Sequence, residues 1–404
     1  MVKLQRMLII CGWCWLLVGC SAGEAPGGAS PIASTPQPQG PTTTLSPPFT
    51  IDATSRWPSL PVQRITTALS DTVRIIFQGT GTPDGRYLLT KLASRFVTSK
   101  GSFPPEQIAL YDTTTGKLKV IGTARDAQHG LTGYVADDHW VAWYELGLPE
   151  ESTDSTWSLY VYNRDTQTTQ TVVPNIQGQG IYPTIGLDQG RLVWSEVDGE
   201  ATVDHAHFVV KLLDLATGKR IIIANRAVGP IIKWPWIGWG QVTGSDGSGH
   251  MQFQNMLTNE SETLNVMADE FILVGTSLVY ESDGHSFTYV PDIHNMSANT
   301  QNFVPSGFGA NAFTINGLTF NGRYVGWHIL GGSGDPYLYD LQTHQRLHFP
   351  MKYPLDGTQL TQIIGHTVTW LEDPNTPDQT AAFKQKNQDP PLIYGLANLQ
   401  SVGG

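Results

Sequence analysis

A strand-and-hairpin unit recurs along most of this 404-residue chain, at intervals of about 40 to 50 residues. Its strand alternates apolar and polar residues after a turn, as in Arg191–Glu196. Its hairpin runs from apolar residues into a tight turn, as in Leu212–Lys219, where an Asp accepts backbone N–H bonds and a Gly adopts positive φ. The repeat therefore predicts a set of similar small sheets, and it constrains the fold more than any other feature.

Seven segments match the strand of this unit: 87–92, 140–144, 192–195, 239–243, 278–281, 324–328 and 367–371. The hairpin turns are evenly spaced as well, since 51 residues separate Asp112 from Asn163 and again Asn163 from Asp214. From Asp214 to Asp340 the interval is 126 residues, or three times 42, which leaves room for two degenerate copies. The chain therefore contains about seven units of several short strands each.

Such units are typical of β-propeller blades, whose two apolar faces are buried only when blades stack around a common axis. A Trp recurs in the central strands, for example Trp143 and Trp194, and we expect it to pack between neighbouring blades. The charged fraction of 15%, with 42 Gly and 12 Trp, agrees with a turn-rich all-β protein. We predict a seven-bladed β-propeller; the alternative is a six-bladed ring in which region 231–312 is irregular.

The seventh unit is one strand short in the sequence. We expect the segment Val73–Phe77, which precedes the first full unit, to supply the missing strand and close the ring. Closure would remove the two exposed sheet edges that otherwise invite aggregation.

The segment Thr82–Leu89 reads Thr-Pro-Asp-Gly-Arg-Tyr-Leu-Leu and resembles the turn-plus-strand signature of TolB-like (PD40, WD40-like) propeller repeats. In this turn Pro presets φ, Asp bonds back to the backbone and Gly adopts positive φ. Partial copies occur at 188–191 and 321–323. The resemblance covers about residues 70–400 and implies the propeller fold, not an activity. TolB carries an α/β domain before its propeller, whereas this chain has only a Pro-rich segment there.

The N-terminus has the features of a bacterial lipoprotein signal. Lys3 and Arg6 precede an apolar stretch, residues 7–18, that is too short to span a bilayer. The following Leu-Val-Gly-Cys resembles the lipobox, which implies cleavage after residue 19 and acylation of Cys20. We therefore expect a signal peptide at 1–19 and an extracytoplasmic, lipid-anchored protein, on the outer leaflet of the cytoplasmic membrane or on the outer membrane.

Residues 20–61 are rich in Pro, Gly, Ser and Thr, and we expect a disordered tether followed by the propeller domain at 62–404. All three cysteines, Cys11, Cys14 and Cys20, precede this domain, so it has no disulfide, thiolate metal site or cysteine nucleophile. The formal net charge of −11 becomes −11 − 2 = −13 without Lys3 and Arg6. This charge argues against nucleic-acid binding.

The search for catalytic motifs finds few candidates. The serines in 331–334 and 244–247 lack the Gly-x-Ser-x-Gly spacing of a nucleophile elbow, and we interpret both segments as hairpin loops. His205 and His207 would lie on the same face of a strand and are weak candidates for metal ligands, although a solvated strand face explains them better. We predict no cofactor.

Trp234, Trp236 and Trp239 place three indoles within six residues. They are candidates for a platform that stacks on a sugar ring or an aromatic ligand. The alternative is that Trp236 and Trp239 pack between blades while Trp234 lies beside the channel. The second interpretation requires no ligand.

We therefore expect a monomeric, non-enzymatic scaffold lipoprotein that binds a protein or peptide partner and is anchored to the membrane by its N-terminal lipid. The alternative is a glycan-binding or glycan-cleaving surface protein with its site at the mouth of the propeller channel, where loops converge. The sequence favours binding over catalysis and leaves the question of enzymatic activity open.

Overall fold

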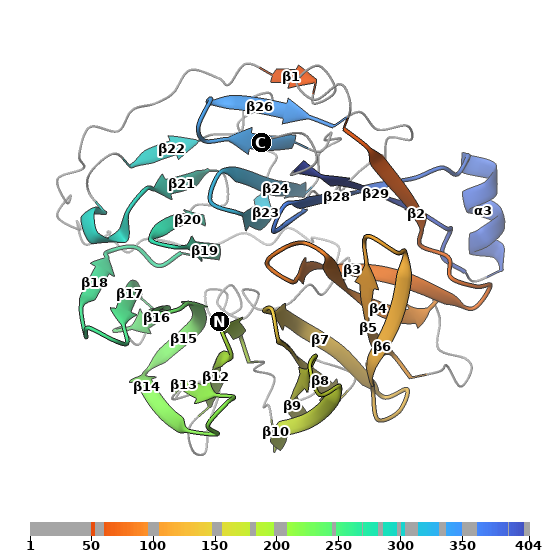
Figure 1. Cartoon of the computed structure of the whole chain (residues 1–404). Coiled ribbons are helices and arrows are strands. Elements are labelled where there is room, and N and C mark those ends of the chain that lie inside the picture. The colour runs from red at the N-terminus through yellow and green to blue at the C-terminus, as the bar shows by residue number, and fades with distance from the viewer. Residues whose placement is uncertain are drawn as a thin grey trace, which may run out of the picture.

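The computed structural model describes residues 50–52, 60–95, 105–147, 156–177, 183–197, 208–244, 248–268, 270–281, 286–296, 300–303, 314–330, 337–349, 362–386 and 388–399. These residues form seven sheets arranged in a ring, the architecture of a seven-bladed β-propeller (Figure 1). The predicted fold is confirmed. Region 231–312, which the six-bladed alternative treats as irregular, contains most of blade 4 and all of blade 5.

Each blade contains four strands in a row, named below from the innermost to the outermost. Blade 1 consists of β3 (Val73–Gly81), β4 (Tyr87–Ser94), β5 (Gln107–Asp112) and β6 (Lys117–Thr123). Blade 2 consists of β7 (His129–Ala136), β8 (Trp140–Gly147), β9 (Thr156–Asn163) and β10 (Thr168–Gln177). Blade 3 consists of β11 (Ile185–Asp188), β12 (Arg191–Val197), β13 (Phe208–Asp214) and β14 (Arg220–Asn225).

Blades 4 to 6 continue the same order. Blade 4 consists of β15 (Ala227–Lys233), β16 (Trp236–Val242), β17 (Gly249–Asn255) and β18 (Ser261–Leu264). Blade 5 consists of β19 (Glu270–Val274), β20 (Ser277–Glu281), β21 (Phe287–Val290) and β22 (Gln301–Phe303), with the 3-10 helix η2 (Ile293–Asn295) before β22. Blade 6 consists of β23 (Thr314–Phe320), β24 (Tyr324–Leu330), β25 (Tyr337–Asp340) and β26 (Gln345–His348).

Blade 7 joins the two ends of the described chain. It consists of β27 (Gln362–Ile364), β28 (Thr367–Glu372), β29 (Ile393–Asn398) and, as its outermost strand, β2 (Val62–Thr66). The strand that closes the ring is therefore β2, paired antiparallel with β29, and the prediction that Val73–Phe77 closes it is wrong. Val73–Phe77 belongs to β3, because blade 1 needs an innermost strand of its own.

A further strand, β1 (Thr50–Asp52), pairs in parallel with β26 and makes blade 6 five-stranded. It lies on the outer rim of the ring (Figure 1). These three residues belong to the segment for which the sequence predicts disorder, and they are held in a strand by the edge of blade 6.

The second strand of every blade coincides with one of the seven segments identified from the sequence. Apolar side chains from consecutive blades form seven clusters, one at each junction around the ring, including the junction of blade 7 with blade 1. Five tryptophans from second strands are buried in the cluster shared with the preceding blade: Trp143, Trp194, Trp239, Trp327 and Trp370. The core therefore lies between the blades, as predicted.

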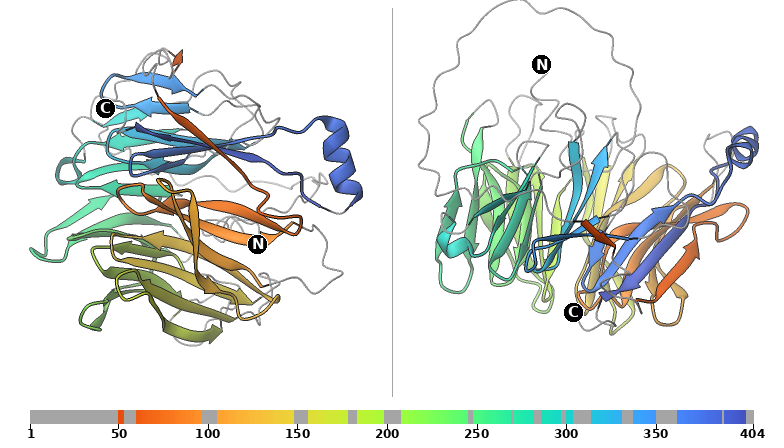
Figure 2. Two further views of the ribbon diagram at one scale, coloured as in Figure 1. Left: turned by 45° about the vertical axis from the view of Figure 1, so that its right-hand side comes forward. Right: turned by 90° about the horizontal axis from the view of Figure 1, so that it is seen from above.

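One α-helix, α3 (Pro377–Gln385), interrupts blade 7 between β28 and β29 and stands off from the rim (Figure 2). Its first turn contains a capping box, in which Thr376 and Gln379 bond each other's backbone N–H, and Pro377 occupies the first helical position. No helix in the described part of the chain is long and apolar enough to cross a membrane.

Candidate functional site

The predicted aromatic platform does not form. Trp236 and Trp239 are only 4% and 5% exposed, and they belong to different junction clusters, one with blade 5 and the other with blade 3. Three residues apart on β16, they point to opposite faces of the blade. The alternative interpretation explains both residues, because each packs between blades.

Trp234 is half-buried in the turn between β15 and β16. The Arg191 guanidinium lies 4.4 Å from the centre of its ring, and its backbone N–H donates to Asp188 Oδ2 at 2.9 Å. Neighbouring Lys233 Nζ donates to Asp188 Oδ1 at 2.8 Å. Blades 3 and 4 are therefore joined at this turn by an ion pair, a backbone hydrogen bond and a cation–π contact.

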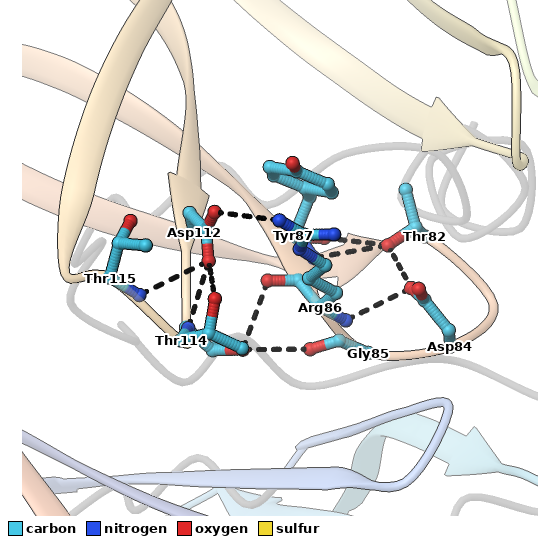
Figure 3. A network of polar contacts seen from close by, with 9 residues as sticks. Thr82, Asp84, Gly85, Arg86, Tyr87, Asp112, Thr114 and Thr115 are labelled. Carbon is cyan, nitrogen blue, oxygen red and sulfur yellow. Dashed lines mark hydrogen bonds and ion pairs between the residues drawn. The ribbon is translucent and has the colours of Figure 1, made fainter.

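Because strands alternate in direction, the turns between first and second strands lie on the same face of the ring as the hairpins between third and fourth strands. We call this the turn face. In blade 1, Asp84 accepts from Arg86 N, and Asp112 Oδ1 accepts from the backbone N–H of Thr114 and Thr115 (Figure 3). Arg86 Nη2 reaches Asp112 Oδ2 at 3.4 Å and ties the two turns together.

The third-to-fourth-strand hairpin has the same chemistry in five blades. An Asp or Asn side-chain oxygen accepts backbone N–H bonds from the second and third residues that follow it, at Asp112, Asn163, Asp214, Asn255 and Asp340. The fourth residue after each has a positive φ: Gly116, Gln167, Gly218, Asn259 and His344. Asn255 belongs to one of the degenerate copies for which the spacing left room. It does not stand out in the sequence, because Gln254 precedes it where Tyr or Leu precedes the other four.

Hydrogen bonds between turns also cross the blade junctions on the turn face. Asp137 Oδ2 accepts from Gly190 N at 2.6 Å between blades 2 and 3. Asn321 Nδ2 donates to Gly365 O at 3.0 Å between blades 6 and 7. Thr367 Oγ1 donates to Gly85 O at 3.0 Å between blades 7 and 1. These polar groups hold neighbouring blades in register and are not available for chemistry.

Charges on this face are paired within blades as well. In blade 6 the fully buried Asp340 accepts from Arg323 Nε at 3.3 Å and Nη2 at 3.1 Å. Burial alone would raise the pKa of Asp340, but the hydrogen bonds from Arg323 and from the Gln342 backbone outweigh burial and lower the pKa below its usual value. Asp340 is therefore an ionised structural residue.

The opposite ends of the strands carry a second recurrent motif, in which a buried Trp is followed two residues later by Glu or Gln. Trp194 Nε1 donates to Glu196 at 2.6 Å and Trp370 Nε1 donates to Glu372 at 3.0 Å. Trp239 Nε1 donates to Gln241 at 3.1 Å. Residues two apart on a strand lie on the same face, so the spacing of Trp and Glu or Gln is a sequence signal that could have identified this motif.

The carboxylates of this motif are also neutralised by cations. Glu196 forms an ion pair with Lys211. Glu372 pairs with Arg64 of β2 at 3.4 Å, which adds an ionic contact to the strand that closes the ring. Both carboxylates are therefore occupied by an indole N–H and a cation of the fold itself.

The long connection between β28 and β29 is fastened to blade 1. Asp389 pairs with Arg74, and Arg95 Nη2 donates to Asp389 O at 3.1 Å. The Arg95 guanidinium lies 5.5 Å from the ring of Phe383 on α3. These contacts cross the junction of the first and last blades and support closure by β2.

Several sequence candidates lie outside the described residues: Cys20, His205, His207, segment 331–334 and most of 244–247. Among the described residues, no group of three or more His, Cys, Asp or Glu side chains is placed to hold a metal ion.

Comparison with known proteins identifies the fold and nothing more specific. No family model and no curated protein matches the chain. The acylaminoacyl peptidase of Pyrococcus horikoshii is 10% identical with a TM-score of 0.52, over 82% of this chain and 53% of that one. A structure from a study of two prolyl endopeptidases is 12% identical with a TM-score of 0.50, over 74% of this chain and 46% of that one. TolB from Acinetobacter baumannii is 13% identical with a TM-score of 0.41, over 62% and 61%.

This chain thus spans about half the length of the two peptidase structures. At such identities the similarity extends to the propeller architecture alone.

Proposed function

We propose that this protein is an extracytoplasmic β-propeller lipoprotein that acts as a non-enzymatic scaffold for a protein or peptide partner. The observation that carries the proposal is the pairing of β1 with β26. There the rim of the ring binds an extended segment by strand addition, with Thr50, Ile51 and Asp52 opposite Arg346, Leu347 and His348. Addition of a strand to a sheet edge is a general mode of peptide recognition, because the main chain supplies the hydrogen bonds.

The lipid anchor is supported by the sequence around Cys20. A chain that leaves the rim at Thr50 and continues to an acylated Cys20 would hold the ring beside a membrane with both faces accessible. The 29 residues between them, 21–49, would span about 30 Å on average as a flexible coil. That distance would allow the ring to turn relative to the bilayer.

The charged groups described above support binding over catalysis. Asp137, Asp188, Glu196, Asp340 and Glu372 are each occupied by backbone or side-chain donors. The glycan-binding alternative loses its main support, because Trp236 and Trp239 are buried on opposite faces of blade 4.

The anchor and the scaffold role require separate tests. Metabolic labelling with a clickable fatty acid should mark the wild-type chain and leave Cys20→Ser unlabelled and released from membranes. Crosslinking of the labelled chain in intact cells should recover a defined partner protein. An unlabelled wild-type chain contradicts the anchor, and recovery of no partner above the level seen with an unrelated lipoprotein contradicts the scaffold.

A further inference from the structure

The outer strand of blade 3, β14, is an apolar sheet edge that no strand of the described residues covers. Ile221 and Ile222 are 37% and 55% exposed, and β14 is the last strand of its sheet in the described structure. Adjacent residues of a strand point to opposite faces, so apolar surface is exposed on both faces of this edge. The strand lies on the rim of the ring, as β1 and β26 do (Figure 1).

The other outer strands are protected in ways that proteins commonly use against edge-to-edge association. β10 exposes Thr and Gln side chains and contains Pro174. β6 exposes Val120, but Lys117 and Lys119 of the same strand are exposed beside it. Among the described side chains of β2, β18 and β22, the exposed ones are polar or charged, and β26 is covered by β1. β14 has two neighbouring exposed isoleucines and no charged residue within its five C-terminal positions, 221–225.

Positive charges lie at both ends of this edge. Lys219 and Arg220 precede the isoleucines, Arg226 follows the strand, and no Asp or Glu occurs from 215 to 233, in a chain whose formal net charge is −11. None of the three cations forms an ion pair with a described residue. The Arg220 guanidinium is held by a hydrogen bond from Nη2 to Val172 O at 3.0 Å. The guanidinium also lies 5.2 Å from the centre of the Trp194 ring. Its charge is therefore fixed in place, and no carboxylate of a described residue neutralises it.

The rim of blade 6 shows what kind of chain such an edge accepts. β1 adds to β26 over three residues, and its sequence is Thr-Ile-Asp, an apolar residue followed by an acid. On β14 the corresponding run, Arg220, Ile221 and Ile222, pairs regularly with β13 before the bulge at Ile223. This regularly paired run on β14 is three residues long, the same length as the pairing of β1 with β26.

We propose that the outer edge of β14 is a docking site for an extended segment of a partner protein, which adds to blade 3 as a fifth strand. The segment carries adjacent apolar residues that pack beside Ile221 and Ile222, and Asp or Glu residues that face Lys219, Arg220 and Arg226. This site deepens the proposed scaffold function and rests on it, because it states where the partner binds and with what chemistry.

A synthetic peptide tests the site directly. The probe is fluorescein-labelled Asp-Glu-Val-Ile-Val-Glu-Asp, titrated against the full chain in detergent micelles and followed by anisotropy. We expect saturable binding that is weakened about tenfold or more by Ile222→Lys, because a lysine opposes the apolar contact. Binding should also weaken as salt rises, since screening reduces the attraction of the acidic flanks. Val120→Lys, the same change on the exposed edge of blade 1, should leave binding unchanged.

Two further measurements separate strand addition from unspecific adhesion. Replacing the central Ile of the peptide with Pro removes a backbone donor and should abolish binding. Amide hydrogen exchange of residues 220–225 should slow when the peptide is bound. Ile222→Thr is the second variant, needed in case Ile222→Lys perturbs the blade. It keeps β propensity while removing apolar contact, so it should weaken binding without disturbing the strand.

Three results would overturn the site: no saturable binding of the peptide, equal binding by wild type and both Ile222 variants, or a concentration-dependent dimer that Ile222→Lys dissociates. The third result would show that a second copy of the chain occupies the edge. A cellular partner captured equally well by wild type and Ile222→Lys would overturn the edge site while leaving the scaffold function intact. Failure to capture any partner, with the peptide still bound at β14, would contradict only the scaffold function.

Discussion

The carboxylate of Asp137 in blade 2 accepts a hydrogen bond of 2.6 Å from the backbone N–H of Gly190 in blade 3. Its other oxygen closes its own turn by accepting from His139 N at 2.8 Å and Trp140 N at 2.7 Å. One buried side chain therefore shapes a turn and joins two blades. Asp188 also joins two blades at the next junction, where it accepts from Trp234 N and Lys233 Nζ of blade 4.

Replacing Asp137 with Asn should destabilise the ring. The amide oxygen can still close the turn, but the amide nitrogen then faces the N–H of Gly190, so a buried donor is left without an acceptor. We expect a loss of about 1–3 kcal/mol in the free energy of unfolding, measured by urea denaturation. Asp138→Asn is the control, because Asp138 is exposed. Equal effects of the two substitutions would contradict a structural role for the inter-blade bond.

Two glycines with similar backbone conformations should respond very differently to alanine. Gly133 has a φ of 63° and a Cβ there would lie 1.8 Å from Tyr144 Cε1, whereas Gly218 has a φ of 72° and no atom within 4 Å of that position. Gly218→Ala should introduce about 1–2 kcal/mol of backbone strain, partly offset by about 0.5–1 kcal/mol because alanine makes the unfolded chain less flexible. Gly133→Ala adds a steric clash and should cost about 2–5 kcal/mol. Thermal unfolding followed by circular dichroism would rank them, and a reversed order would be inconsistent with this packing.

A glycine should improve the hairpin of blade 2. Gln167 has a φ of 58° at the position that Gly116 and Gly218 occupy in blades 1 and 3. Gln167→Gly relieves a left-handed strain of about 1–2 kcal/mol and loses about 0.5–1 kcal/mol through the more flexible unfolded chain. We expect a net gain of about 0.5–1 kcal/mol. Gln170→Gly, an exposed position within β10, should instead lower the unfolding midpoint.

Closure by β2 should matter far more than addition of β1. Deleting Val62–Thr66 removes the outer strand of blade 7, exposes the edge of β29 and leaves Glu372 without its Arg64 partner. We expect loss of cooperative unfolding and rapid digestion by a nonspecific protease. Deleting Thr50–Asp52 removes only the fifth strand of blade 6 and should change the unfolding midpoint little. Similar protease resistance of both deletions would show that another segment closes the ring.

Asp340 should make the protein sensitive to acid. Its pKa in the folded protein is lowered, below the value of about 3.9 expected in the unfolded chain. The ionised form therefore favours folding, and this contribution is complete above the unfolded pKa and is lost as the pH falls through the folded pKa. Urea unfolding at about pH 7, 4 and 2.5 should show a decline in stability. The decline should be smaller in Asp340→Asn, which is less stable than wild type at neutral pH; an identical decline in both proteins would exclude Asp340 as its source.

Local sequence patterns predicted much of the ring. The seven second strands were identifiable because each places apolar residues directly after a turn, as in β4 and β12. The expected half-buried alternation is wrong for these strands, since most of their consecutive residues are buried between two blades. The hairpins at Asp112 and Asp214 were identifiable because Asx side chains and glycine satisfy a tight turn within a few residues. The packing of Trp143 between blades was predicted because a Trp recurs in the central strands, and the cluster between blades 1 and 2 confirms it.

The candidate site was predicted less well, because its properties depend on residues distant in the chain. The spacing of Trp234, Trp236 and Trp239 suggested one platform, but strand geometry sends two of them to opposite blade junctions. The docking edge at Ile221 and Ile222 looks in sequence like any apolar strand. Its exposure follows only from its place at the rim.

The sequence by itself determined the repeated unit and the turn chemistry, because each depends on interactions among residues a few positions apart. It favoured seven blades over six, and the structure decided for seven. Only the tertiary structure decided that β2 and not Val73–Phe77 completes blade 7, and that Ile221 and Ile222 are exposed on an outer strand. Most outer strands are exposed and, unlike β14, carry little apolar pattern, so their partners are selected by the geometry of the closed ring. Arg64 pairs with Gly395, so the strand of blade 7 that comes first in the sequence, β2, lies beside the strand that comes last, β29. Local sequence carries no trace of that register, because it exists only once the other blades have brought the two ends together.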